Sequence, residues 1–268
     1  MTVVATTPRT SVGLPGSTAT LRAEWVKFWT VRSTPWSLSA MFVLGAGLTT
    51  LVCALSAEAL ARGDVGEPAG AFVTWGIVFA QVTAVVLGAL VVTSEYGTGM
   101  IRATLAATPR RGAVLAAKAV VLASTLFVAG TLTALAGYLG GNWFLDREGI
   151  GLALSDGGVL RSILGSGLYM AGLGLFAAGV GLLVRHTAAA LAVVLGLVFV
   201  VGNLVMVLPG AWGEWATKLM PGNAGSRIAT PESFNPLLLD PWVGFAVFAA
   251  EVAAVLVLAA VVFTRRDA

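Results

Sequence analysis

The sequence predicts an all-α, polytopic membrane protein with six transmembrane helices. Of its 268 residues, 57% are hydrophobic and 11% are charged, and the mean hydropathy is +0.91. Soluble domains contain roughly 45–50% apolar and about 25% charged residues, so this composition excludes a water-soluble fold. Several apolar runs reach the ~20 residues that a helix needs to cross the hydrocarbon core. The runs lack the alternation of lipid-facing barrel strands, which favours helices.

Each of the six expected spans is a long apolar run bounded by polar, glycine or proline residues. The third run is longer than a membrane crossing requires, so we expect its first turns to lie in the cytoplasm. The expected spans are residues 36–57, 71–93, 111–140, 160–184, 187–208 and 242–264.

The distribution of Lys and Arg predicts that both termini are cytoplasmic. With the N-terminus inside, most of the 16 basic residues fall on the cytoplasmic side, as the positive-inside rule requires. We therefore expect a multi-pass protein of the cell (plasma) membrane whose basic residues meet lipid headgroups, with no nucleic acid as a partner. The cytoplasmic set is Arg9, Arg22, Lys27, Arg32, Arg102, Arg110, Arg111, Lys118, Arg185, Arg265 and Arg266.

The segment before the first span has the pattern of a helix lying in the membrane interface. Leu21, Trp25, Phe28 and Trp29 share one helical face, with Arg22, Glu24 and Lys27 off it. Ser33-Thr34-Pro35 is expected to break this helix and turn the chain into the bilayer. An ordinary juxtamembrane flank is the alternative. The expected organisation is a disordered cytoplasmic tail (1–20), an amphipathic helix (21–34) and a six-helix membrane domain (35–268).

Two further segments have informative patterns. Residues 211–220 are expected to form a short amphipathic helix that dips into the outer interface, or else a surface loop anchored by Trp212 and Trp215. The fourth span contains small-xxx-small pairs such as Gly167/Ala171 and Gly174/Ala178, which allow helices to approach closely. The pattern fits packing within one subunit and between subunits equally well.

The loop between the second and third spans is more elaborate than a simple hairpin needs. Gly97 and Gly99 permit a sharp exit from the second span, and a two-turn helix over Met100–Ala107 is expected to follow. Ile101 and Leu105 would share one face of that helix, while Arg102 lies off it and Thr108 caps the next helix. Such a helix, held along the membrane surface, could transmit a push from a soluble partner to both attached spans.

The residue types argue against enzymatic activity in this chain. A phosphate-cradling G-x-x-x-x-G-K-[ST] motif is absent from the sequence, so energy from ATP must come from another polypeptide. His186 is the only histidine, and we expect no metal or cofactor site. Glu251 and Asn203 are polar residues inside spans and are candidates for a substrate path, although a role in interhelical hydrogen bonding is the alternative for both.

The loop contains Glu95-Tyr96-Gly97-Thr98-Gly99-Met100-Ile101-Arg102, followed by Leu105, Thr108-Pro109-Arg110-Arg111 and Lys118. This pattern resembles the first cytoplasmic loop of type-2 ABC transporter permeases. This family exports drugs, antibiotics, lipids or polysaccharides. The six expected spans, the interfacial helix before the first and the amphipathic segment before the last are similar to the same family, so the resemblance covers nearly the whole chain.

The resemblance implies a coupling helix that docks on a separate ATP-binding cassette ATPase, which binds ATP and Mg²⁺. The working unit would pair two permease chains, as a homodimer or heterodimer, with two ATPase chains. Leu21, Trp25, Phe28 and Trp29 would belong to the family's connecting helix. By position, the ATPase contact would comprise Gly97, Thr98, Met100, Ile101, Arg102, Leu105 and Thr108.

Three other functions remain open from the sequence. A membrane-embedded regulatory or assembly protein that binds a soluble partner but transports nothing would have similar interfaces. An ion-coupled transporter would use Glu251, and its transport would persist without ATP. An intramembrane hydrolase is disfavoured because the spans offer no paired nucleophile and base.

Overall fold

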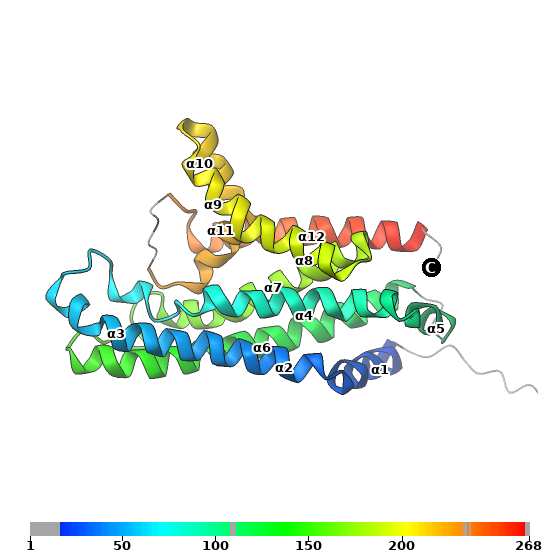
Figure 1. Cartoon of the computed structure of the whole chain (residues 1–268), viewed down its shortest axis with the longest axis horizontal. Helices are drawn as coiled ribbons and strands as arrows, with labels where there is room; N and C mark the ends of the chain where they lie inside the picture. The colour runs from blue at the N-terminus through cyan, green and yellow to red at the C-terminus, as the bar shows by residue number, and fades with distance from the viewer. Residues whose placement is uncertain (1–16, 108–110, 233–234, 236, 266–268) are drawn as a thin grey trace, which may run out of the picture.

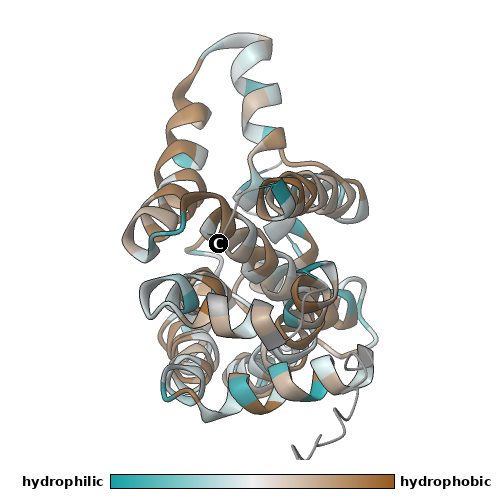
Figure 2. Cartoon of the chain, turned by 90° about the vertical axis from the view of Figure 1, so that its right-hand side faces the viewer, coloured by the Kyte–Doolittle hydropathy of each residue, from teal (hydrophilic) through white to brown (hydrophobic). Residues whose placement is uncertain are grey.

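The computed structural model describes residues 17–107, 111–232, 235 and 237–265, and these residues form helices and connecting loops without a β-strand. Six helical segments are long and apolar enough to cross a membrane, which confirms the all-α polytopic fold. They are Ser33–Arg62, Ile77–Gly97, Arg111–Arg147, Val159–Val184, Thr187–Val207 and Pro241–Arg265. Figure 2 shows that hydrophobic residues dominate most of these helices.

Four of the spans are single helices, and two contain π-helical or 3-10 segments. The single ones are α4 (Ile77–Gly97), α6 (Arg111–Arg147), α7 (Val159–Val184) and α12 (Pro241–Arg265). The first span joins α2 (Ser33–Phe42), the π-helical η1 (Val43–Gly47) and α3 (Leu48–Arg62). The fifth joins α8 (Thr187–Leu195), the π-helical η3 (Gly196–Val201), α9 (Gly202–Leu204) and the 3-10 turn η4 (Val205–Val207).

The remaining elements are short and lie before or between the six spans. Helix α1 (Ser17–Thr30) precedes the first span, and α5 (Met100–Ala107) joins α4 to α6. Figure 1 places α1, α5 and the C-terminal end of α12 together at one end of the bundle. The others are η2 (Ala69–Ala71), α10 (Gly210–Leu219), α11 (Pro221–Ser226) and η5 (Arg227–Ala229).

Helix α7 is the centre of the bundle. It packs against α4, α6, α8 and α12 and is the most buried of the six spans. The small residues of its sequence make this packing close. A Cβ placed on Gly88 of α4 would overlap the carbonyl oxygen of Gly174, and one on Gly172 would lie 2.5 Å from the Phe248 ring of α12. These glycines are therefore used for packing within one subunit.

An arm built from the end of the fifth span and α10 projects from the bundle (Figure 1). Pro209 ends the span with an extended backbone, and α10 then runs back towards the bundle. The predicted amphipathic helix over 211–220 is present as α10, where Trp212 is 89% exposed. The Lys218 ammonium lies 5.2 Å from the centre of the Trp215 ring.

Several predicted boundaries were wrong by a few residues. The second span starts at Ile77 instead of 71, because the preceding apolar residues form η2 and turns. The third continues to Arg147 instead of 140. The break after the interfacial helix falls at Val31-Arg32, and Pro35 lies in the first turn of α2, where its missing N–H costs no helical hydrogen bond.

Candidate functional site

The candidate site is the end of the bundle where α1, α5 and the nearby ends of α4 and α6 meet (Figure 1). The predicted loop helix is present as α5, with the predicted bounds Met100–Ala107. Gly99 makes the turn into it with φ of 72°, a left-handed conformation that glycine adopts without steric cost. Thr98 stays with α4, because its hydroxyl donates to the Ser94 carbonyl at 2.8 Å.

Helix α5 buries one of the residues expected in the ATPase contact and exposes others. Ile101 is only 6% exposed and lines a small internal space with Val92, Val114 and Phe263. Its side chain therefore anchors α5 to the bundle. Met100 is 46% exposed, and Ala103 and Ala106 are also exposed.

Three further residues were expected in the ATPase contact. The side chains of Arg102 and Leu105, and the whole of Thr108, lie outside the described residues. Gly97 is the last residue of α4, and a Cβ placed on it would meet open space.

Helix α1 packs against α6 and divides its residues between two faces. Leu21, Trp25 and Trp29 are exposed, as expected for a helix in the membrane interface. Phe28 was expected on the same face but is 6% exposed, and its ring lies edge-on to Trp29 at 5.8 Å. The corner between α1 and α2 is held by the Thr34 hydroxyl, which donates to the Phe28 carbonyl at 2.7 Å.

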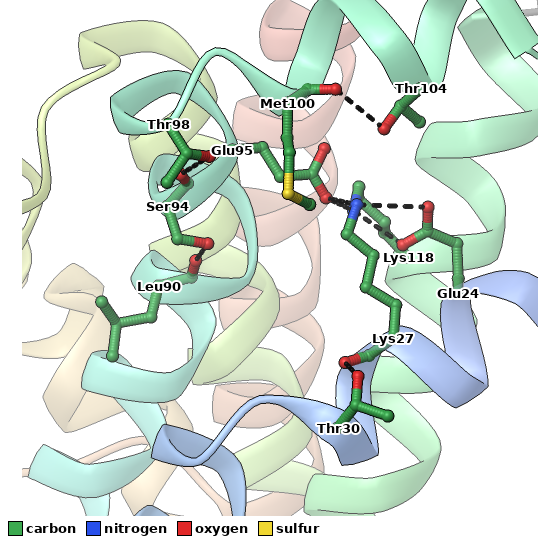
Figure 3. Close-up of polar contacts among 10 residues, drawn as sticks. All are labelled: Glu24, Lys27, Thr30, Leu90, Ser94, Glu95, Thr98, Met100, Thr104 and Lys118. Carbon is green, nitrogen blue, oxygen red and sulfur yellow. Dashed lines mark hydrogen bonds and ion pairs between the residues drawn. The ribbon is translucent and has the colours of Figure 1, made fainter.

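A buried cluster of charged residues joins α1, α4 and α6 (Figure 3). We call Glu24, Lys27, Glu95 and Lys118 the charged cluster. The Lys118 ammonium donates to Glu24 Oε2 at 2.7 Å and to Glu95 Oε1, and Lys27 also donates to Glu95 Oε1. Glu24, Glu95 and Lys118 are 8%, 2% and 7% exposed. Because buried charges are costly unless they are paired, the cluster fixes how these three helices meet.

The charged cluster corrects one sequence-based expectation. Lys118 was expected to reach the lipid headgroups, but it lies inside the protein between two carboxylates. The sequence around Lys118 indicates its burial, since Ala117 and Ala119 flank it in an otherwise apolar stretch. Its partners are 94 and 23 residues away, so spacing along the chain could not identify them.

A groove of about 250 Å³ lies beside the charged cluster. Its walls are mainly apolar and come from α1, α2, α4, α5 and α6, and the four residues of the charged cluster line its polar end. The hydroxyl-bearing residues Ser33, Thr34, Ser94 and Thr98 also line the groove. The apolar wall consists of Phe28, Val31, Leu87, Leu90, Val91, Met100 and Val121.

Polar contacts tie the other helices to the same end of the bundle. The Arg111 guanidinium donates to the Phe263 carbonyl of α12 at 3.1 Å. The Thr187 hydroxyl at the start of α8 donates to the Thr93 hydroxyl of α4 at 2.8 Å. His186 caps α8, where its Nδ1 accepts from the Ala189 N–H at 3.3 Å. The first two contacts therefore join α6 to α12 and α8 to α4 at this end.

The two candidates for a substrate path lie apart from this end and are not brought together by a common cavity. Asn203 lines a second cavity, of about 340 Å³, together with Gln81, Tyr169 and Arg227, and donates to the Phe199 carbonyl at 2.6 Å. Glu251 is half-buried on α12 and lines neither this cavity nor the groove. Its Oε2 has no hydrogen-bond partner among the described residues.

Comparison with known proteins adds no assignment, because no protein-family model and no curated protein matches the chain. Among the described residues no group of three or more His, Cys, Asp or Glu could hold a metal ion. The six apolar helices define a membrane protein.

Proposed function

We propose that this chain is the membrane-spanning permease subunit of an ATP-driven ABC transporter, powered by a separate ATPase that docks on α5. The observation that carries the proposal is α5 itself: a short helix between two spans, seated on the bundle through Ile101 and open to solvent at Met100 and Ala103. A helix held in this way can receive force from a soluble protein and pass it to α4 and α6.

The surroundings of α5 support the transmission of force. The Lys118 ammonium connects α6 to Glu95, near the end of α4, and to Glu24 of α1. A rigid connection of this kind would move the three helices together when α5 is pushed. Two such chains, as a homodimer or heterodimer, would enclose a path that ATP binding and hydrolysis open towards the other side of the membrane.

The proposed role is export of a hydrophobic or amphiphilic compound. The second cavity has an apolar wall with Val78, Val198 and Phe199 and polar groups from Gln81 and Asn203. This mixture suits a molecule with an apolar body and a few polar atoms. ATP hydrolysis belongs to the partner in this proposal, and the permease chain itself catalyses no reaction.

The first test is co-purification of the tagged chain with an ATP-binding protein encoded by a neighbouring gene. Ala103→Trp places a large side chain on the exposed face of α5 and should reduce recovery of the ATPase about tenfold or more. The matched control is Ala61→Trp, the same change at an exposed alanine near the end of α3. The control should bind the ATPase as the unmodified chain does.

The outcomes separate the transporter from a non-transporting regulatory protein. The permease proposal is supported if Ala103→Trp loses the ATPase while Ala61→Trp retains it, and if the unmodified complex carries out ATP-dependent transport in vesicles. A folded chain that binds no ATPase, or a complex that hydrolyses ATP but moves no compound, overturns the proposal in favour of a regulatory or assembly role.

A further inference from the structure

We infer that the groove beside the charged cluster is a binding site for a membrane phospholipid with a primary ammonium headgroup, such as phosphatidylethanolamine. The headgroup would meet the charged cluster and the upper part of one acyl chain would lie along the apolar wall. This inference requires that the chain spans a bilayer but does not depend on the proposed transport.

The position of the groove matches the interface of one leaflet. Its polar end is formed at Glu95 and Lys118, near the ends of two spans, and its apolar end at Leu87 lies further into α4. Eight residues separate Leu87 from Glu95, which corresponds to about 12 Å along a helix. The groove therefore runs from headgroup depth into the hydrocarbon region, as a phospholipid does.

The polar end has a hydrogen-bonding capacity that the protein does not use. Glu95 Oε1 accepts from both lysines, but Glu95 Oε2 is buried and has no partner among the described residues. An unpaired carboxylate oxygen is costly in such surroundings. A carboxylate offers about four acceptor sites and the two lysines use two of them, so an ammonium that enters along the groove would find spare acceptor capacity on Glu95.

The arrangement of charges favours a zwitterionic lipid with N–H donors. Lys27 is the most exposed cation of the charged cluster, with 26% of its side chain accessible, and can meet a phosphate group. The four charges of the cluster already balance, so a headgroup that carries one positive and one negative charge adds no net charge. Phosphatidylcholine has the same charges but no N–H, so it could not donate to Glu95.

The apolar walls of the groove would hold the part of the lipid below the headgroup. Leu87, Leu90, Val91 and Val121 offer a continuous apolar surface to the first part of an acyl chain. The volume of about 250 Å³ is close to the lower end of ligand pockets, which start at roughly 300 Å³. The remainder of the lipid would stay in the bilayer.

The test is native mass spectrometry of the delipidated full-length chain, titrated with four phospholipids of equal acyl composition. They are phosphatidylethanolamine, its N,N-dimethyl derivative, phosphatidylcholine and phosphatidylglycerol. We expect phosphatidylethanolamine to bind about tenfold more tightly than phosphatidylcholine, the effect of one charge-assisted hydrogen bond. The dimethyl lipid, which retains one N–H, should bind nearly as well as phosphatidylethanolamine.

Three variants locate the site. Leu90→Trp fills the groove and should abolish the preferred binding, whereas Val120→Trp, on the exposed face of α6, should not. Glu95→Gln should remove the preference between the amine lipid and phosphatidylcholine, with folding checked by its elution volume and melting temperature. Should Glu95→Gln fail to fold, the comparison of Leu90→Trp with Val120→Trp still decides.

Two results would overturn the inference. Equal binding of all four lipids would mean that the groove holds only water or unspecific lipid. Preferred binding of phosphatidylglycerol would mean that the basic residues at this end attract anionic lipid without a contribution from Glu95.

Discussion

Replacement of Lys118 by methionine should destabilise the protein strongly. Methionine preserves most of the side-chain volume but removes the ammonium that donates to Glu24 and Glu95. Lys27 remains bound to Glu95 but lies 4.0 Å from Glu24, so one buried carboxylate loses its main partner. Breaking a buried ion pair in this way costs about 3–5 kcal/mol. Because Lys27 compensates in part, we expect about 3 kcal/mol.

The assay is the melting temperature in detergent micelles, followed by tryptophan fluorescence. For a chain of this size, 1 kcal/mol corresponds to roughly 2–4 °C, so the melting temperature should fall by about 10 °C. The matched control is Lys218→Met, which removes a lysine from α10 in the projecting arm. This variant should change the melting temperature by no more than about 2 °C.

A second variant tests whether the effect arises from the unpaired carboxylate. Lys118→Met combined with Glu24→Gln removes one charge of each sign and leaves Glu95 paired with Lys27. This double variant should be more stable than Lys118→Met alone. If the single variant melts within 2 °C of the unmodified protein, or if the double variant melts lower still, the buried cluster does not hold α1 to the bundle.

Two further substitutions test the packing. Gly88→Ala should lower the stability by about 2 kcal/mol, because its Cβ would overlap the Gly174 carbonyl. The control Gly112→Ala has open space at its Cβ and should be neutral or slightly stabilising. Equal melting temperatures of the two variants would refute the close contact between α4 and α7. Tyr169→Phe should lower the stability by about 1–2 kcal/mol, since it removes the 2.6 Å hydrogen bond that the hydroxyl donates to Gln81. A melting curve identical to that of the unmodified protein would contradict this prediction.

Hydropathy alone predicted the class of fold and the number of spans. Long apolar runs need a helix to satisfy the backbone in a bilayer, so the existence of each span follows from composition. The start of α4 could not be predicted in this way, because residues 71–76 are apolar yet form turns. There the backbone of Gly76 lies against Gly45, and its N–H donates to the Thr49 hydroxyl at 2.9 Å.

The candidate site was predicted less completely than the fold. Helix α5 was predicted from the two glycines before it and from its apolar spacing, but the burial of Ile101 against the bundle was not, because helical spacing does not indicate which side is covered. The charged cluster was missed since Glu24 and Lys118 come from distant parts of the chain. Only the packing of α1 on α6 brings them together.

The charged cluster also bears on how the chain acquires its orientation in the membrane. In the folded protein Lys27 and Lys118 are balanced by Glu24 and Glu95, so these four residues give the bundle end no net charge. The excess of positive charge at this end therefore comes from arginines such as Arg22, Arg32 and Arg185. During insertion, before the helices meet, both lysines still count towards the positive-inside rule. In the orientation that the Lys and Arg distribution predicts, the same two side chains would act first as orientation signals and then as internal partners.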